Sequence, residues 1–263
     1  MLVDSHCHLD FPDLAGEREA VLARARAAGV VTMLTISTRL DEFPRVRSIA
    51  DSDPDIWCSV GAHPHEAADH IGVTVGQLAV LAEHPRVVGI GETGLDFYYD
   101  HSPRELQERV FRTHIAASKA SGLPLIVHAR DADAEIAKIL REEKPPGGVL
   151  HCFSSGRGLA EAALDLGFYI SISGIVTFRN ADGLRAIVRD VPLDRLLVET
   201  DAPYLAPVPY RGQPNEPAYV AATAAAVAEL KQVSREELAA ATTDNFFRLF
   251  GKARRPMTCS PNT

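Results

Sequence analysis

Short apolar runs alternate with helical patterns along almost the whole chain, and this alternation limits the possible folds more than any other feature. Eight runs are expected to be strands, at residues 2–8, 30–37, 56–62, 87–91, 125–128, 149–151, 168–172 and 196–199. Helical patterns lie between them, near residues 17–28, 41–50, 75–82, 103–121, 133–143, 158–166 and 181–189. Nearly continuous apolar strands with short connections indicate a parallel sheet covered by helices. Eight strands favour a closed sheet, so the predicted fold is an α/β protein, a (β/α)8 TIM-type barrel.

Two more helical segments, residues 217–230 and 236–250, follow the eighth run. Ser234, with Glu237 three positions later, is expected to cap the start of the second segment. In the same way, Ser102 with Glu105 is expected to cap the start of the helix at residues 103–121. No linker or internal repeat divides the chain. Residues 1–251 are therefore expected to form one domain, and residues 252–263 a polar C-terminal tail. The 263 residues would also permit two smaller domains, and the 46% hydrophobic content can supply a large core.

The four cysteines, Cys7, Cys58, Cys152 and Cys259, are scattered without a Cys-x-x-Cys spacing. This pattern argues against a zinc ribbon or a disulfide framework and indicates a reducing, cytoplasmic location. A strand expected from residue 2 leaves no room for a signal peptide, and no apolar run is long enough to span a membrane. A soluble protein without an obligate protein partner is expected.

Residues that bind divalent metals lie at the ends of several apolar runs. They are His6, His8, Glu92, His128, His151 and Asp201. Because barrel active sites are built at the carboxyl ends of the strands, all six are expected on one rim. His6 and His8 are two positions apart on an extended segment and point to the same face. Cys7 and Cys152 alternate to the other face and are not expected to be ligands.

Four imidazoles and two carboxylates suit a pair of divalent cations such as Zn, Mn, Mg, Ni or Co. Unpaired carboxylates gathered at one point would repel one another, whereas two cations would keep them ionised. The sequence therefore predicts a metal-dependent hydrolase with two ions per chain.

Six blocks of residues occur in order along the chain. They are His6-Cys7-His8-Leu9-Asp10, Gly61-Ala62-His63-Pro64-His65, Gly91-Glu92-Thr93-Gly94-Leu95-Asp96, Val127-His128-Ala129-Arg130-Asp131, His151-Cys152-Phe153-Ser154 and Glu199-Thr200-Asp201-Ala202-Pro203-Tyr204-Leu205. Together these blocks resemble the TatD family of metal-dependent deoxyribonucleases. The resemblance runs to Asn245-Phe246 and covers nearly the whole chain.

The resemblance implies an amidohydrolase-type barrel with a two-metal centre. By similarity, one ion would be held by His6, His8, Glu92 and Asp201. The other would be held by Glu92, His128 and His151, with Glu92 as the bridge. The resemblance also implies a 3′-5′ exonuclease that acts on the ends of single-stranded DNA or RNA.

A water shared by two cations would supply hydroxide near neutral pH beside the scissile group. Asp201 is the expected catalytic residue that accepts the proton or orients the nucleophile and later protonates the leaving oxygen, while Glu92 bridges the ions.

Substrate contacts are expected from the rim residues His63, Arg130, Asp96, Tyr204 and Arg211. Each has a structural alternative: an ordinary hydrogen-bonded histidine at His63, an ion pair of Arg130 with Asp131 or Asp96, and a loop tie at Arg211. His65 is a weaker candidate of the same kind. Four other histidines are expected away from the rim, namely His70, His84, His101 and His114.

The formal net charge of −8 excludes the strong basic field of a protein that wraps duplex nucleic acid. Cleavage at a strand end requires few phosphate contacts and stays compatible with this charge. Two alternatives remain open. One is an esterase or amidase of the same superfamily, for example an aminoacyl-tRNA deacylase, because fold and metals do not select the bond. The other is a metal-stabilised binding protein without turnover.

Overall fold

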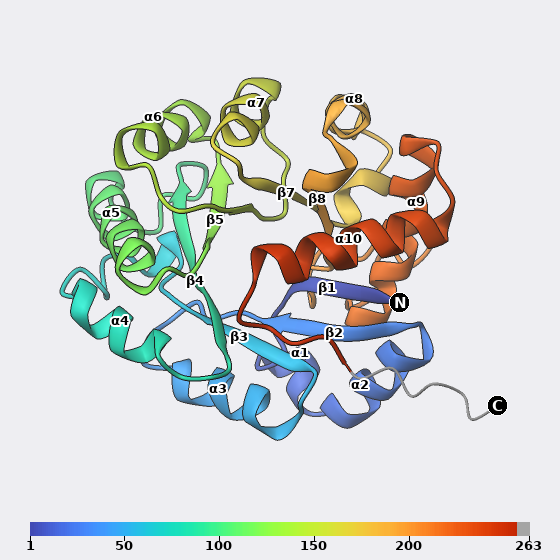
Figure 1. Ribbon diagram of the computed structural model, residues 1–263, viewed down its shortest axis with the longest axis horizontal. Helices are drawn as coiled ribbons and strands as arrows, with labels where there is room; N and C mark the ends of the chain where they lie inside the picture. The colour runs from blue at the N-terminus through green and yellow to red at the C-terminus, as the bar shows by residue number, and fades with distance from the viewer. Residues whose placement is uncertain (257–263) are drawn as a thin grey trace.

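Eight parallel strands alternate with helices in residues 1–256, the part of the chain that the computed structural model describes (Figure 1). The strands are β1 (Leu2–Cys7), β2 (Val30–Thr35), β3 (Ile56–Val60), β4 (Val87–Asp96), β5 (Leu125–Arg130), β6 (Gly148–Leu150), β7 (Tyr169–Ile172) and β8 (Leu196–Val198). Each strand pairs in parallel with the next one along the chain. This order confirms the predicted (β/α)8 barrel.

The ends of the sheet meet between β1 and β8. Cys7 and Ala202 form a parallel bridge there. The buried carboxyl of Asp4 in β1 also accepts a hydrogen bond of 2.9 Å from the backbone N–H of Thr200 and one of 2.5 Å from its hydroxyl. Side-chain bonds thus supplement backbone pairing where the barrel nearly closes.

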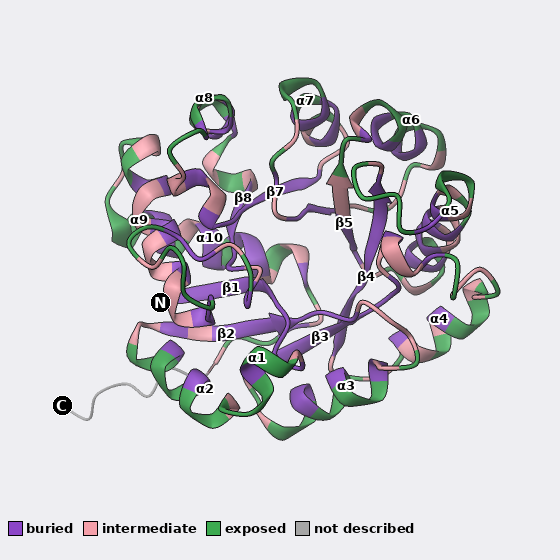
Figure 2. Ribbon diagram, turned by 180° about the vertical axis from the view of Figure 1, so that it is seen from behind, coloured by how far each residue is buried: buried purple, intermediate pink, exposed green. Residues whose placement is uncertain are grey.

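Helices surround the ring and turn their apolar sides toward it, so that the strands are buried and the outward faces exposed (Figure 2). They are α1 (Pro12–Ala15), α2 (Arg18–Ala27), α3 (Phe43–Ser52), α4 (Val75–Ala82), α5 (Arg104–Ser121), α6 (Asp133–Glu143), α7 (Arg157–Asp165), α8 (Asp182–Asp190), α9 (Val220–Lys231) and α10 (Arg235–Leu249). The predicted helices agree with these bounds to within a few residues, and α9 and α10 are the expected C-terminal additions.

The two predicted helix caps have different outcomes. Ser234 caps α10 as expected, because its hydroxyl accepts a hydrogen bond of 3.0 Å from the Glu237 N–H. The prediction for Ser102 is wrong. Its hydroxyl donates to the carbonyl of His65 at 2.6 Å and accepts from the Ala68 N–H, so it ties two rim loops together instead of capping α5.

The inside of the barrel is filled by one apolar side chain or more from each strand, and α10 closes it at the amino-terminal end. Phe246 of α10 and Phe250, the residue after it, join Trp57, Val88 and the other inward side chains in one cluster. In Figure 1, α10 lies across the front of the strands. A second and larger cluster lies between the strands and the outer helices. With one end closed, a substrate can reach the interior only from the carboxyl ends of the strands.

Two strands extend further than predicted, and both carry candidate ligands. β4 was expected to end at residue 91 and reaches Asp96, whereas β5 was expected to end at residue 128 and reaches Arg130. Glu92 and His128 therefore lie within strands and not beyond them. The polar extensions pair with each other, after a register shift between Ile90 and Thr93.

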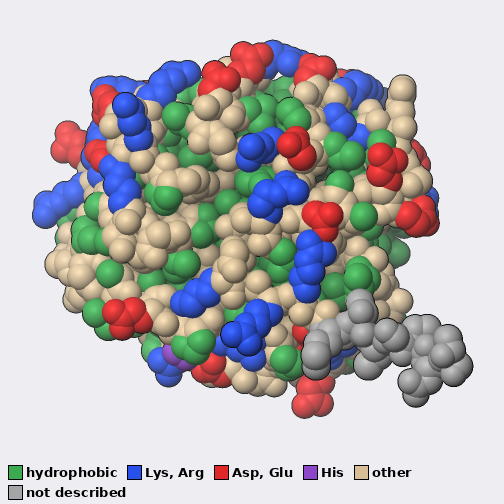
Figure 3. All heavy atoms as spheres, viewed as in Figure 1, with side chains coloured by type: hydrophobic (Ala, Val, Ile, Leu, Met, Phe, Trp, Pro, Cys, Tyr) green, Lys and Arg blue, Asp and Glu red, His purple; other side chains and the backbone are tan. Residues whose placement is uncertain are grey.

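The packed part of the chain continues to at least Ala253, which is buried against the α10 cluster. The Lys252 ammonium donates to the carbonyls of Ala82 and His84 at 2.9 and 2.7 Å. The rest of the expected tail, residues 257–263, and Cys259 lie outside the described residues. On the face viewed in Figure 3, cationic and anionic side chains are interspersed. No helix in residues 1–256 combines the length and the apolar character that crossing a membrane requires.

Candidate metal centre

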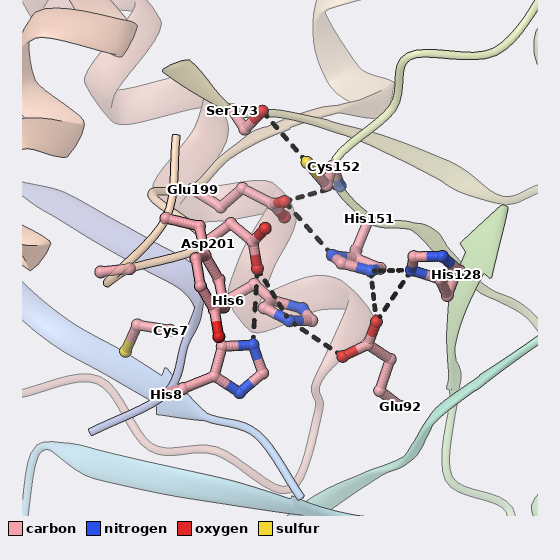
Figure 4. Close-up of polar contacts among 12 residues, drawn as sticks. His6, Cys7, His8, Glu92, His128, His151, Cys152, Ser173, Glu199 and Asp201 are labelled. Atoms are coloured by element: carbon pink, nitrogen blue, oxygen red, sulfur yellow. Dashed lines mark hydrogen bonds and ion pairs between the residues drawn. The ribbon is translucent and has the colours of Figure 1, made fainter. Parts of the chain in front are cut away.

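All six side chains predicted as metal ligands converge at the carboxyl ends of the strands (Figure 4). His6 and His8 come from β1 and the residue after it, Glu92 from β4 and His128 from β5. His151 directly follows β6, and Asp201 follows β8 by three residues. Five strands that are distant in sequence thus contribute to one cluster, as the sequence predicts. The Cys7 side chain points away from it, also as predicted.

Glu92 lies at the centre of the cluster, and its two oxygens face different imidazoles. Oε1 lies 2.7 Å from His151 Nε2 and 3.1 Å from His128 Nδ1. The two imidazole nitrogens are themselves 3.4 Å apart, so these three side chains present a compact triangle of donor atoms. Oε2 lies 3.4 Å from His6 Nε2. The two oxygens of Glu92 thus face different imidazoles, although the rings of His6 and His151 stack on each other with their centroids 3.8 Å apart.

Asp201 lies beside His6 and His8. Its Oδ1 lies 3.6 Å from His6 Nε2 and 3.4 Å from His8 Nε2. Such separations exceed an ordinary hydrogen bond. They are close to the roughly 3–3.5 Å expected between neighbouring ligand atoms around an ion bound at about 2.1 Å.

The imidazoles of His128 and His151 each have a second carboxylate beside the ring nitrogen that does not face Glu92. His128 Nε2 lies 3.1 Å from Asp96 Oδ2, and His151 Nδ1 lies 3.4 Å from Glu199 Oε1. Carboxylates in this position orient a ligating histidine and set its tautomer. Asp96, which the sequence suggests as a substrate contact, is buried and lies against His128 instead.

Glu199 is a further candidate for the site, one that the sequence does not single out. Its side chain is fully buried, and Oε1 also accepts a hydrogen bond of 2.6 Å from the Cys152 N–H. The available signal was an acidic residue at the end of an otherwise apolar eighth run, two positions before Asp201.

The donor types and the unsatisfied polar atoms of this cluster fit divalent cations. Burial acts to raise the pKa of Glu92, but the neighbouring imidazoles, chiefly those of His151 and His63, hold it well below its usual range. Both ring nitrogens of His6 and Nδ1 of His8 are buried without hydrogen-bond partners in the described chain. Buried polar groups normally have partners, and neutral imidazoles and ionised carboxylates are typical ligands of such metals.

Comparisons with known proteins agree on one family. The profile of the family TatD related DNase matches residues 3–251. The chain belongs to the TatD family. "Uncharacterized metal-dependent hydrolase YcfH" of Escherichia coli K12 is 50% identical over 254 residues, which cover 95% of each chain. YabD of Bacillus subtilis, with the same description, is 39% identical and is covered to 99%, with 95% of this chain aligned. The crystal structure of the E. coli TatD homologue YjjV superposes with a TM-score of 0.90 at 34% identity, over 95% of this chain and 98% of that one.

In this TatD-family protein, His63 lies beside the cluster. Its Nε2 is 3.4 Å from Glu92 Oε1, and its Nδ1 accepts a hydrogen bond of 3.1 Å from the His65 N–H. A neutral imidazole that accepts at Nδ1 carries its proton on Nε2. His63 therefore presents an N–H toward the centre, which suits a hydrogen-bond donor better than a ligand.

His65 and His101 extend the histidine cluster outward. His65 Nε2 lies 2.8 Å from Asp96 Oδ2, and the His65 ring contacts that of His101 at 4.6 Å. The expectation that His101 lies away from the rim is wrong, because the loop after β4 folds back across η1 (Pro64–Glu66).

The remaining predicted contacts lie further from the centre. The Arg130 guanidinium stacks over Tyr98 and does not form the alternative ion pair with Asp131 or Asp96 in the described residues. Arg211 stacks over Phe178 at 3.8 Å and donates to the Ala206 carbonyl. The structural alternative for Arg211, a tie within the loop after β8, is therefore what the structure shows.

Proposed function

We propose that this TatD-family protein is a divalent-metal-dependent nuclease that hydrolyses phosphodiester bonds from the 3′ end of single-stranded DNA or RNA. The observation that carries the proposal is Glu92, whose two oxygens face different buried donor atoms, Oε1 those of His128 and His151 and Oε2 that of His6. These side chains would hold a pair of cations, which would supply the metal-assisted chemistry of phosphoryl transfer. The description of the family, TatD related DNase, supports the same substrate class.

In this proposal the two ions would share Glu92. One ion would be held by His6, His8, Glu92 and Asp201, and the other by Glu92, His128 and His151. Asp96 and Glu199 hold His128 and His151 in the orientation that directs one ring nitrogen of each toward Glu92.

When bound, divalent ions neutralise charge on the phosphoryl oxygens and make a nucleophile available at neutral pH. Asp201 is the carboxylate best placed to accept the proton of the attacking water. Its side chain is 14% exposed, against 2% for Glu92 and 0% for Glu199. Burial raises the pKa of Asp201, but His8 and the other imidazoles lower it below its usual value, so the group is ionised at neutral pH. It can then return the proton to the leaving oxygen.

Preference for a strand end follows from the charge of the whole protein. A formal net charge of −8 does not supply the overall basic field that a duplex-wrapping protein uses. A terminal nucleotide needs only local contacts at the centre. We also propose a reducing, cytoplasmic location, which the unpaired Cys7, Cys58 and Cys152 support.

The test compares metal-stripped protein with protein restored by Zn, Mn, Mg, Ni or Co. Single strands labelled at the 5′ or the 3′ end, matched duplexes, and an ester and amide panel that includes aminoacyl-tRNA serve as substrates. We expect progressive shortening from the 3′ end of single strands only after a metal is restored.

Variants connect the activity to this site. His128→Ala and Asp201→Ala should lose cleavage, whereas His84→Ala, a histidine in the loop between α4 and β4 at the opposite end of the barrel, should retain it. Equal cleavage by the stripped protein, or by both site variants, would disprove the proposal. Turnover of esters or amides without any cleavage of nucleic acid would replace it with the esterase alternative.

A further inference from the structure

The side chains of the candidate metal centre form a row of contacts, with His8 at one end and Asp96 at the other. From Glu92 the contacts pass through His6 and Asp201 to His8 on one side. On the other side they pass through His128 to Asp96. Exposed aromatic side chains lie at both ends of this row, and the proposed hydrolysis gives them no role.

At the Asp96 end, two tyrosines are held directly beside the centre. The backbone N–H groups of Tyr98 and Tyr99 each donate to Asp96 Oδ1 at 3.0 Å. Their rings are nevertheless 59% and 48% exposed. The Arg130 guanidinium lies 4.4 Å from one ring centre and 4.7 Å from the other. A fixed pair of rings and a cation therefore border this side of the site.

At the His8 end, a second ring is anchored in the same way. The Tyr204 N–H donates to the Asp201 carbonyl at 2.9 Å, and the ring is 54% exposed. Its edge packs on Phe11 at 6.1 Å, and Phe11 in turn stacks on His8 at 4.5 Å with an interplanar angle of 21°. Tyr204 is thus supported by the candidate ligand itself.

Single exposed rings separated by a polar centre do not form the continuous apolar surface that a lipid or an apolar peptide segment needs. They suit flat ligands that alternate with charge, as bases alternate with phosphates in a single strand. Arg130 can stabilise a phosphate on its side. No cation contacts the Tyr204 ring in residues 1–256, and the carboxylates of Asp201 and Asp13 act on its hydroxyl, which favours a base there over a phosphate.

We propose that Tyr98 with Tyr99 and Arg130, and Tyr204 on Phe11, are two base-stacking subsites that hold the nucleotides on either side of the scissile phosphodiester. The proposal rests on the nuclease function and names its substrate more closely. A duplex end would have to unpair before its bases could reach both rings, so single strands are preferred. Stacking contributes roughly 1–3 kcal/mol per base, which corresponds to roughly 5- to 150-fold in binding or in kcat/KM.

The experiment uses metal-restored protein and two strands of equal length, one with all its bases and one with abasic residues at its last two positions. Tyr98→Ala and Tyr204→Ala should each lower kcat/KM on the base-bearing strand roughly 5- to 150-fold. Tyr98→Phe and Tyr204→Phe keep the ring and serve as matched controls, with values close to the parent protein. On the abasic strand all five proteins should be alike.

Alanine variants that cleave the base-bearing strand as fast as the parent, or that lose as much on the abasic strand, would overturn the subsites while leaving the nuclease function intact. Cleavage of neither strand by the parent protein would refute the nuclease function. The subsites are then judged by binding, through the fluorescence quenching of 2-aminopurine at the 3′ end of the strand. Tyrosine-dependent quenching would support them, and equal affinity of parent and alanine variants would refute them.

Discussion

His114 should make the stability of the protein depend on pH between about 4 and 6.5. This histidine of α5 is fully buried. Its Nδ1 lies 2.8 Å from the Val110 carbonyl and must donate to it, while its Nε2 accepts a hydrogen bond of 3.1 Å from the Ala62 N–H. The ring is therefore neutral, and a proton on Nε2 would place two donors against each other.

Burial is the main reason that the pKa of His114 falls to about 4 in the folded protein, against 6.5 for an ordinary histidine. A depressed pKa means that the unfolded chain binds the proton more tightly. The stabilising effect of the neutral ring is thus fully present above pH 6.5 and disappears as the pH falls through 6.5 toward 4. The full shift corresponds to about 3 kcal/mol, and the interval from pH 7 to pH 4.5 to about 2 kcal/mol.

Urea unfolding of the wild type and of His114→Gln at closely spaced pH values measures this effect. Glutamine can accept from the Ala62 N–H but does not titrate, so subtracting the two curves removes the contribution of the carboxylates. We expect the stability advantage of the wild type to shrink by about 2 kcal/mol from pH 7 to pH 4.5. A constant difference, or an NMR titration of the His114 ring near pH 6.5, would refute the reasoning.

Four further predictions concern the candidate centre, the strands beneath it and one outer helix. Asp96→Asn should weaken metal retention roughly 10- to 100-fold in competition with a chelator, because the support behind His128 is altered, whereas the exposed Asp165→Asn should not. Gly94→Ala should cost roughly 2 kcal/mol or more in urea unfolding, since a Cβ at this position, with φ of +136°, would lie 2.1 Å from the His128 carbonyl oxygen; a neutral result would contradict the close approach of β4 and β5. Gly183→Ala in α8 meets open space and should stabilise by about 0.5–1 kcal/mol. A metal at about a thousand times its Kd should stabilise the wild type by about 4 kcal/mol and raise its Tm, with a smaller rise in His151→Ala, and equal rises would remove His151 from the ligand set.

The sequence predicted the strands and the convergence of the candidate ligands better than it predicted the contacts of individual side chains. Eight apolar runs mark the strands because each parallel strand of a barrel is buried on both faces and must be apolar throughout. Metal-binding residues at the ends of these runs meet because parallel strands share one carboxyl end. Ser234 and Glu237 mark the start of α10 for a reason that involves only four consecutive residues.

The predictions of the Ser102 cap and of the ends of β4 and β5 were wrong because the hydrogen-bond partners of these residues come from other segments. Ser102 and Glu105 have the same spacing as Ser234 and Glu237, yet the Ser102 hydroxyl binds His65, which the local pattern does not reveal. The extensions of β4 and β5 contain polar residues and lack an apolar signature, and they form because the two strands supply each other's hydrogen bonds.

The sequence by itself determined which elements form, their order around the barrel and the set of side chains that gather at its open end, because these properties follow from apolar periodicity and from strand direction. Only the tertiary structure decided how each side chain acts there. It oriented the two oxygens of Glu92 toward different imidazoles, turned Asp96 and Glu199 into supports behind His128 and His151, and directed the Nε2–H of His63 toward the centre. Such roles depend on distances of about 3 Å between atoms of different strands, which the register and closure of the barrel set and no single segment encodes.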